Sequence, residues 1–309
     1  MDSLSGKPLI VIAGPTAVGK TAASVRLAEW IGGEIVSADS MQVYRGMDIG
    51  SAKASLAERR GIPHHLLDIV DPSENFSVAR YQKYANEALQ DIQSRGRIPI
   101  LVGGTGFYIQ AVLYGIDFTE EDNDPLYRAY LYRIAEEEGP DALYRMLMET
   151  DPESARSIPS HNVKRVARAL EFYHDTGLRM SEHNARQRMK ESPFDYRYFV
   201  LYTERSRLYE RIGVRVDEML EKGLLSEVKG LRERGMTEDM TSMHAIGYRQ
   251  LFAYLDGRNS YDEAVENIKR ETRRYAKRQL TWFRREKNAR FVDVEKEDLI
   301  DVYETRNFT

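Results

Sequence analysis

Apolar residues along this chain gather into short runs, separated by glycine-rich turns and by stretches with helical periodicity. Four such runs predict strands, at residues 8–13, 34–38, 98–102 and 196–202. The segment from Ala22 to Ile31 follows the first run and has the pattern of a helix packed on one side. Strands that alternate with helices predict an α/β fold, in which a parallel sheet is flanked by helices.

The pattern changes between Asp117 and about Pro193, where charged and tyrosine-rich segments replace the apolar runs. A polar break at residues 120–125 marks the change, and helices are predicted near residues 126–138, 140–149 and 162–175. The strand at 196–202 then returns to the α/β pattern. We therefore expect an all-helical insertion domain at 117–193, and a core domain made of residues 1–116 and 194–309.

A long amphipathic helix is predicted close to the C-terminal end. Ser260 and Glu263 have the spacing of a capping box at its start. Five positions then recur at helical spacing and form one stripe: Val265, Ile268, Thr272, Tyr275 and Trp282. We expect this stripe to be buried, so that Tyr275 and Trp282 serve packing, while basic residues on the other faces are free to meet a ligand.

Positive charge is concentrated locally although the chain of 309 residues has a formal net charge of −4. Residues 269–278 and 282–285 together hold eight cations and one acid, and Lys164, Arg165 and Arg168 form a second cluster. Such clusters can pair with the phosphates of RNA, but a charge run is also the usual solvated face of a helix. Charge alone leaves both interpretations open.

Residue types and segments that are absent from the sequence exclude several classes of protein. The chain contains no cysteine, which excludes disulfides and thiolate zinc sites. No apolar stretch approaches membrane-spanning length, and residues 1–7 lack the apolar core of a signal peptide. We expect a cytoplasmic protein that has no membrane contact.

A phosphate-binding loop is predicted at residues 14–21, which read Gly-Pro-Thr-Ala-Val-Gly-Lys-Thr between the first strand and the first helix. Backbone N–H groups and the helix dipole favour an anion at this place. Lys20 adds a cation, and the hydroxyl of Thr21 can bind a magnesium ion. The core is therefore predicted to be a P-loop NTPase-like sheet.

The loop lacks one partner that phosphate-transferring enzymes of this fold use. They carry an aspartate after a second apolar strand to hold the metal, whereas here the strand at 98–102 ends in Gly103-Gly-Thr-Gly106. The strand at 34–38 does end in an acid, Asp39, within the sequence Asp39-Ser-Met-Gln-Val-Tyr44. A carboxylate at a strand end beside a phosphate loop is a candidate general base, a metal ligand or a helix cap.

Six sequence blocks occur in an order that is similar to one family. They are residues 14–21, Asp39 to Tyr44, Gly50-Ser-Ala-Lys53, Gly103-Gly-Thr-Gly-Phe-Tyr108, Ile246-Gly-Tyr-Arg-Gln250 and residues 274–284, Arg-Tyr-Ala-Lys-Arg-Gln-Leu-Thr-Trp-Phe-Arg. Together they resemble the bacterial-type tRNA dimethylallyltransferases, also called tRNA isopentenyltransferases or the IPP transferase family. The resemblance runs nearly from end to end of the chain.

The resemblance implies a prenyltransferase rather than a phosphoryl transferase. A dimethylallyl group would pass from dimethylallyl diphosphate to N6 of adenosine 37 of tRNA, next to the anticodon, and diphosphate would leave. The implied partners are the anticodon stem-loop of tRNA and dimethylallyl diphosphate, with Mg²⁺ as cofactor and no obligate protein partner. Asp39 matches the general base of the family, and Arg215 matches an arginine that acts on the diphosphate.

The phosphate loop, the charge clusters and the resemblance together assign residues to three parts of a site. The catalytic residues would be Asp39, Thr105 and Arg215. The diphosphate would be held by Gly14, Thr16, Ala17, Gly19, Lys20, Thr21 and Lys53, with Thr21 as the magnesium ligand. The tRNA would contact Asp39, Ser40, Met41, Gln42, Thr105, Lys164, Arg165, Arg168, Gly247, Tyr248, Arg249, Lys277 and Arg278.

Other interpretations remain at this point. The chain is alternatively a kinase or NTPase of the same fold, an adenylate isopentenyltransferase that uses free nucleotides, or an RNA-binding module without catalysis. From the residues alone, Thr105 has the alternative role of a turn residue beside glycines, and an isolated helix arginine such as Arg215 is more often an exposed residue. The segment 247–250 is equally a turn that packs two helices together.

Overall fold

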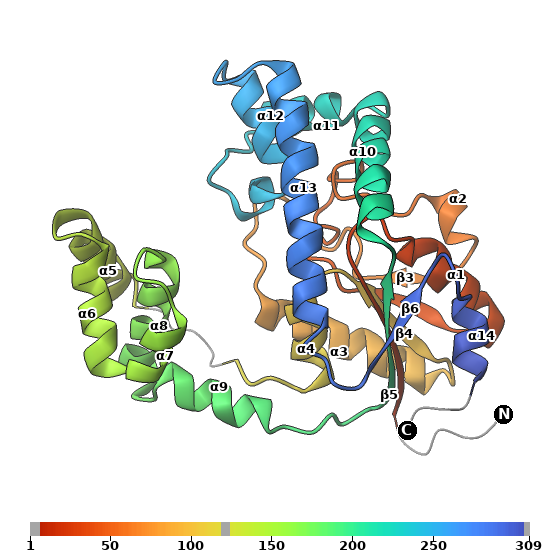
Figure 1. Cartoon of the computed structure of the whole chain (residues 1–309), viewed down its shortest axis with the longest axis horizontal. Helices are drawn as coiled ribbons and strands as arrows, with labels where there is room; N and C mark the ends of the chain where they lie inside the picture. The colour runs from red at the N-terminus through yellow and green to blue at the C-terminus, as the bar shows by residue number, and fades with distance from the viewer. Residues whose placement is uncertain (1–6, 119–123, 306–309) are drawn as a thin grey trace. The chain divides into compact units, whose positions relative to one another are not determined.

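A six-stranded parallel sheet forms the centre of the first unit of the chain (Figure 1). The computed structural model describes residues 7–118 and 124–305. The strand order is β3-β2-β4-β1-β5-β6, and every neighbouring pair is parallel. The strands are β1 (Pro8–Ala13), β2 (Glu34–Ser37), β3 (His64–His65), β4 (Pro99–Gly103), β5 (Asp195–Tyr202) and β6 (Ala289–Asp293). The predicted parallel-sheet fold is confirmed, although the edge strand β6 was not predicted.

Helices cover both faces of this sheet. Ile10, Ile35 and Ile100 belong to one buried cluster together with residues of α1, and the alternate positions Leu9 and Leu101 are at most 1 % exposed on the other face. Side chains that are buried on both sides are typical of a parallel sheet between helical layers. The helices of this unit are α1 (Lys20–Ile31), α2 (Leu56–Arg59), α3 (Val78–Ser94), α4 (Gly106–Leu113), α10 (Arg205–Glu221), α11 (Leu224–Glu233), α12 (Tyr248–Leu255), α13 (Tyr261–Phe283) and α14 (Leu299–Glu304), with the 3₁₀ turn η1 (Thr241–His244).

The second compact unit runs from Tyr114 to Ser192 and is helical throughout its described part. Its helices are α5 (Pro125–Glu137), α6 (Pro140–Thr150), α7 (Pro152–Ser157), α8 (Val163–Thr176) and α9 (Met180–Arg188). Leu131, Leu143 and Leu170 are at most 2 % exposed in its own core. The expected insertion was 117–193, with helices close to α5, α6 and α8. Most of the predicted polar break, residues 120–123, lies outside the described residues.

The long helix α13 begins as its capping pattern predicts. Ser260 and Glu263 exchange side-chain and backbone hydrogen bonds at the N-terminus. The predicted buried stripe was partly wrong, because Tyr275 and Trp282 are only partly buried. The buried positions of α13 are Ala264, Ile268, Ala276, Gln279 and Phe283.

Among the described residues, no helix has the length and the apolar composition that a membrane span requires.

Candidate active site and nucleic-acid interface

The loop between β1 and α1 has the backbone geometry of a phosphate cradle. Gly14 has φ +151°, and a Cβ at this position would stand 2.6 Å from the carbonyl oxygen of Leu201 in the neighbouring strand β5. Gly19 has φ +101° and is the residue from which α1 starts. Both positions therefore favour glycine. Thr21 is exposed in the first turn of α1, where its hydroxyl can reach a ligand.

Lys20 folds back over this loop in the structure. Its Nζ donates hydrogen bonds to the carbonyl oxygens of Gly14 at 3.0 Å and Pro15 at 2.7 Å. Burial first, and then the positive charge of Arg215, lower the pKa of Lys20 to about 7, while the negative charge of Asp39 opposes both effects. The amine is therefore sensitive to any anion that enters the loop, because an added negative charge raises its pKa.

Arg215 and Asp39 share the electrostatic neighbourhood of Lys20 although they come from different elements. Arg215 lies on α10, and burial lowers its pKa while the charge of Asp39 raises it. Asp39 lies two residues beyond the end of β2. The fold thus brings together three residues that the sequence assigned to one site, from positions 20, 39 and 215.

Asp39 is held by a local turn, and its charge acts on two neighbouring tyrosines. Its Oδ1 accepts a hydrogen bond from the backbone N–H of Met41 at 2.9 Å. Within residues 7–118 and 124–305, its Oδ2 has no hydrogen-bond partner. Burial first, and the charge of Asp39 in addition, raise the pKa values of Tyr81 and Tyr275, the latter to about 12. The hydroxyl of Tyr81 also donates to the carbonyl oxygen of Ser37 at 3.1 Å, two residues before Asp39.

The glycine-rich turn after β4 is joined directly to the Asp39 segment. The N–H of Thr105 donates to the carbonyl oxygen of Ala38 at 3.2 Å, and Oγ1 of Thr105 accepts from the N–H of Ser40 at 3.2 Å. A Cβ at Gly103 would meet the carbonyl oxygen of Ala38 at 2.1 Å, so only glycine lets the two segments approach this closely. Thr105 therefore lies next to Asp39, as the resemblance implied.

The residues at this site suit a magnesium ion that is held mainly by the substrate. Among the described residues there is no group of three or more His, Cys, Asp or Glu side chains arranged to hold a metal. Mg²⁺ keeps several waters and commonly binds through one or two protein oxygens together with substrate phosphates. The exposed hydroxyl of Thr21 beside the phosphate loop fits that mode.

Two predicted ligand contacts have their polar groups occupied by the protein itself. Oε1 of Gln42 accepts from the hydroxyl of Ser37 at 2.9 Å, and its Nε2 donates to two backbone carbonyl oxygens. Nζ of Lys53 donates to the carbonyl oxygen of Tyr44, to Asp48 at 2.7 Å and to Asp68, and its side chain is 3 % exposed. These three bonds use all N–H donors of the ammonium group. Gln42 and Lys53 therefore shape loops in this structure and do not offer free groups to a ligand.

The segment 247–250 packs helices together, and Gly247 and Tyr248, which were expected to contact RNA, are buried in this structure. Tyr248 is 0 % exposed, and its hydroxyl donates to Oε1 of Glu227 at 2.5 Å. Gly247 is buried with φ +101° at the start of α12. Only Arg249 of the three predicted contacts in this segment is exposed. This agrees with the alternative interpretation of the segment as a helix-packing turn, but the sequence did not identify the partner of Tyr248, Glu227 on α11.

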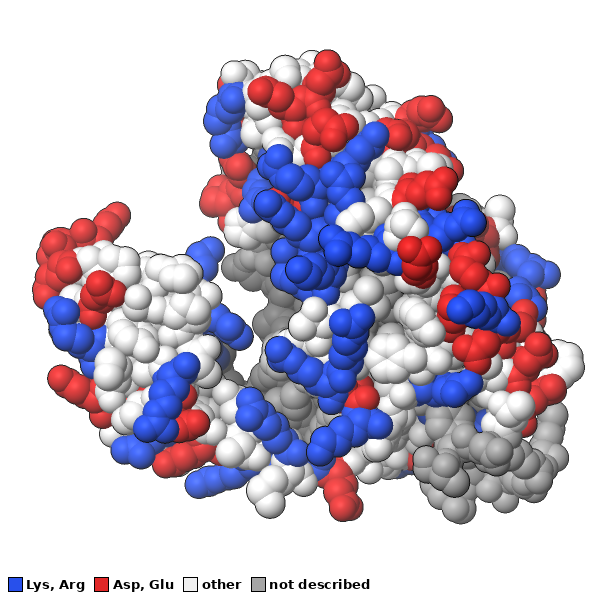
Figure 2. Space-filling model, viewed as in Figure 1, with Lys and Arg blue, Asp and Glu red and all other residues white. Residues whose placement is uncertain are grey.

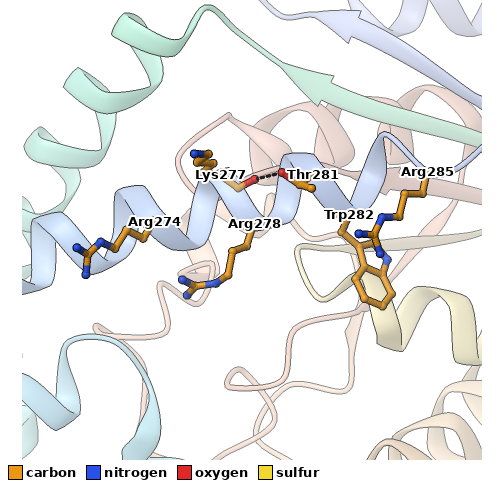
Figure 3. Close-up of a pocket in the computed structure, with 6 residues that line it drawn as sticks. All are labelled: Arg274, Lys277, Arg278, Thr281, Trp282 and Arg285. Atoms are coloured by element: carbon orange, nitrogen blue, oxygen red, sulfur yellow. Dashed lines mark hydrogen bonds between the residues drawn. The ribbon is translucent and has the colours of Figure 1, made fainter. Parts of the chain in front are cut away.

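A basic pocket of about 440 Å³ opens along α13 (Figure 3). It is lined by Arg274, Lys277, Arg278, Thr281, Trp282 and Arg285. The guanidinium group of Arg278 stands 5.7 Å from the ring centre of Tyr275, and Arg274 pairs with Glu271 at 2.7 Å. Figure 2 shows Lys and Arg side chains gathered over this helix. Trp282 packs on Gly106 and also lines the pocket, so the prediction of packing alone was incomplete.

The second unit carries its own cations. Lys164 and Arg165 are exposed on α8. Arg168 is partly buried and lies 3.8 Å from Glu171, whose carboxylate also binds Arg128 at 2.7 Å. Lys164 and Arg165 therefore offer free charge to a polyanion, whereas Arg168 is engaged with the core of its own unit.

Sequence reasoning missed Gln279, whose side chain connects the two loops of the site. Its Oε1 accepts from the N–H of Thr16 at 3.0 Å, and its Nε2 donates to the carbonyl oxygen of Gly104 at 3.0 Å. Gln279 is 5 % exposed. A signal was present in the sequence, because Gln279 is a polar residue four positions after Tyr275 and three before Trp282 on the inward stripe of α13.

Comparison with known proteins adds independent evidence. The family model described as IPP transferase matches residues 42–286. The tRNA dimethylallyltransferase of Lachnoclostridium phytofermentans is 51 % identical over 282 residues, which cover 91 % of this chain and 90 % of that protein. The corresponding protein of Bacillus licheniformis is 50 % identical over 287 residues, covering 93 % and 91 %.

Solved structures of related proteins are similar to this chain over nearly its whole length. The full-length tRNA isopentenylpyrophosphate transferase of Bacillus halodurans has a TM-score of 0.72 at 45 % identity and covers 96 % of this chain and 94 % of that one. A eukaryotic dimethylallyltransferase described as acting on tRNA has a TM-score of 0.82 at 33 % identity, covering 96 % and 78 %. These matches confirm the resemblance and the enzyme class predicted from the motifs. The chain therefore belongs to the IPP transferase family.

Proposed function

We propose that this protein transfers a dimethylallyl group from dimethylallyl diphosphate to N6 of adenosine 37 of tRNA, and that diphosphate is released. The names of its relatives support the reaction class. The observation that supports the proposal is the position of Lys20 on the glycine loop, where its Nζ binds the carbonyl oxygens of Gly14 and Pro15 and its charge is coupled to those of Arg215 and Asp39. This arrangement offers two cations for a departing diphosphate and one carboxylate for an acceptor amine. Because the proposed substrate is tRNA, we place the reaction in the cytoplasm.

The cationic side of the site stabilises the leaving group. When the bond between the allylic carbon and the diphosphate oxygen breaks, negative charge grows on the diphosphate, and in this proposal the positive charges of Lys20 and Arg215 balance it. The diphosphate contacts proposed for this structure are Gly14, Thr16, Ala17, Gly19, Lys20 and Thr21. A magnesium ion bound through Thr21 would neutralise part of the same charge.

The acidic side of the site acts on the acceptor. The amine at N6 of adenosine is weakly basic, so it needs a group that orients it and takes its proton as the carbon–nitrogen bond forms. We assign both tasks to Oδ2 of Asp39, since Oδ1 accepts from the N–H of Met41. Ser40 and Thr105 border the same position. The proton thus moves from N6 to Asp39 while the electron pair of the broken bond leaves with the diphosphate.

Exposed cations supply the proposed contacts with the rest of the tRNA. Lys277 and Arg278 line the basic pocket of α13, Arg249 is exposed at the start of α12, and Lys164 and Arg165 are exposed on α8. Phosphate contacts of this kind give an affinity that falls steeply with salt. The target base must leave its stack to reach a carboxylate at the end of a strand.

One incubation tests the reaction. Purified protein, magnesium, dimethylallyl diphosphate and unmodified tRNA are mixed, and the nucleosides are analysed by mass. A gain of one five-carbon unit on adenosine is expected. Modification of free AMP with no product on tRNA would favour the adenylate isopentenyltransferase alternative, and phosphate release from ATP without prenyl transfer would favour an NTPase.

Two variants separate the chemical role from RNA binding. Asp39→Asn keeps the size of the side chain and removes the base, so we expect transfer to fall by about 10²- to 10⁴-fold, with tRNA binding unchanged. Lys277→Gln combined with Arg278→Gln should weaken tRNA binding and flatten its salt dependence, while the rate of transfer to tRNA that is already bound should change little. Full transfer by Asp39→Asn would refute the role given to Asp39.

A further inference from the structure

The side chain of Gln279 bonds to both loops of the site, which follow the paired strands β1 and β4. Its amide oxygen binds the N–H of Thr16 in the phosphate loop, and its amide nitrogen binds the carbonyl oxygen of Gly104 in the turn that carries Thr105. Thr16 is 263 positions and Gly104 is 175 positions from Gln279 along the chain. A buried residue of α13 thus joins loops that the sequence places far apart.

The contact is closely fitted. A Cβ at Gly104 would stand 2.2 Å from Nε2 of Gln279, so the turn reaches the amide only because residue 104 is glycine. One turn further along the same face of α13, the ring of Trp282 lies against Gly106. A Cβ at Gly106 would stand 2.2 Å from Cδ1 of this ring. Between these two glycines, Oγ1 of Thr105 accepts from the N–H of Ser40 at 3.2 Å. The turn from Gly104 to Gly106 therefore rests on this face of the helix.

The chemistry of the link is specific to an amide. The N–H of Thr16 needs an acceptor and the carbonyl oxygen of Gly104 needs a donor, and one neutral amide supplies both. A carboxylate has no donor, and a hydrocarbon side chain has neither group. Since Gln279 is 5 % exposed, water has little access to replace a lost bond.

We propose that Gln279 is a positioning residue that sets the distance between the loop that holds the diphosphate and the turn that places Thr105 beside Asp39. The proposal rests on the proposed function, because the first loop then holds the donor and the second borders the acceptor. Gln279 does not take part in the bond changes. It acts by keeping the two substrates at reacting distance, where an error of about 1 Å reduces the rate by about 100-fold.

The variant Gln279→Glu tests this directly. In its ionised form the introduced carboxyl group still accepts from Thr16 but repels the carbonyl oxygen of Gly104, whereas in its protonated form it donates to Gly104 and restores both bonds. We expect kcat to fall by about 30- to 100-fold at roughly pH 8 with the KM for tRNA nearly unchanged. The ratio of kcat for the variant to kcat for the original protein should rise as the pH is lowered, because burial raises the pKa of a carboxyl group.

Two further variants serve as controls. Gln279→Leu removes both bonds, so its loss of kcat should not recover at low pH. Gln93→Glu makes the same chemical change on α3, where Nε2 of Gln93 donates to the carbonyl oxygen of Pro8 at 2.9 Å, far along β1 from the loop. It should leave kcat and its pH profile as they are. A pH-independent ratio for Gln279→Glu, or the same recovery in Gln93→Glu, would overturn the proposal.

A readout that needs no activity separates this proposal from the proposed reaction. In the original protein the N–H of Thr16 is protected by Gln279, so its hydrogen exchange should be slow and should speed up in Gln279→Leu. If the Thr16 N–H exchanges faster in Gln279→Leu but the original protein transfers no prenyl group, the role of Gln279 is supported and the proposed reaction is refuted. If this exchange is unchanged and the original protein is active, the role of Gln279 is refuted and the proposed reaction is supported.

Discussion

Tyr248→Phe is the change that separates packing from RNA contact in the segment that follows η1. The hydroxyl of Tyr248 is buried and donates to Oε1 of Glu227 at 2.5 Å. The carboxylate of Glu227 also accepts from the backbone N–H groups of Asp48 at 2.8 Å, Ile49 at 2.8 Å and Gly50 at 3.1 Å. This cluster fastens the loop at 48–50 to α11 and α12.

The expected loss of stability follows from these bonds. A hydrogen bond to a charged group contributes about 1.5–3 kcal/mol. After Tyr248→Phe the carboxylate keeps its three backbone donors, so the free energy of unfolding should fall by the smaller amount, about 1.5 kcal/mol. Glu227→Gln turns an N–H group toward those backbone donors, and the free energy of unfolding should fall by about 3 kcal/mol. Both variants should bind tRNA with the affinity and salt dependence of the original protein.

Urea unfolding and tRNA binding at several salt concentrations measure the two quantities. Tyr173→Phe is the matched control, because Tyr173 is 43 % exposed and the same substitution there should change the urea midpoint little. If Tyr248→Phe weakened tRNA binding while the urea midpoint stayed in place, the packing role would be refuted and the contact predicted from the sequence would be right.

Three other outcomes follow from the structure. Binding of inorganic diphosphate should take up a proton at Lys20, whose pKa of about 7 rises when an anion lies beside it. The affinity should therefore fall by up to about tenfold per pH unit above pH 7, and equal proton uptake in Lys20→Met by calorimetry would contradict this. Gly104→Ala should lower kcat as Gln279→Leu does, and the double variant should lose little more, within about threefold; fully additive losses would show that the two positions act separately. Glu34 has a pKa of about 2, lowered first by its hydrogen bonds from Arg95, so its contribution to stability is complete above the ordinary carboxyl pKa of 4.5 and is lost as the pH falls toward 2. Glu34→Gln should remove about 2 kcal/mol of unfolding free energy at neutral pH, after allowance for the exposure of Arg95, and an unchanged urea midpoint at pH 7 would show that the pair contributes nothing.

Local features of the chain were predictable because their causes are close in sequence. The phosphate loop depends on Gly14, Gly19 and Lys20, which lie within a few residues of the strand and the helix that they connect. The capping box at Ser260 and the helices of the second unit depend on the same short range. The strand β6 was missed because its short run of five residues has little periodicity and is paired by β5 alone.

Some predicted site residues had other roles because an amino-acid type does not say which partner it will meet. Lys53 has the charge for a diphosphate, yet the fold surrounds it with three acceptors. Tyr248 has an aromatic ring for a base, yet it is enclosed with Glu227. In both cases the role of the residue depends on the partners beside which it is buried, and a charge pattern or a motif does not predict those partners.

The amino-acid sequence by itself determined the α/β pattern, the anion loop and the family, because periodicity and short motifs are set by residues that are neighbours along the chain. Only the tertiary structure decided which side chains face one another across the site. It brought Asp39 and Arg215 to Lys20, and it seated Gln279 between Thr16 and Gly104. The contacts of Gln279 join positions 263 and 175 residues apart, and they form only when parallel strands end at one edge of a sheet and a long helix packs across their loops.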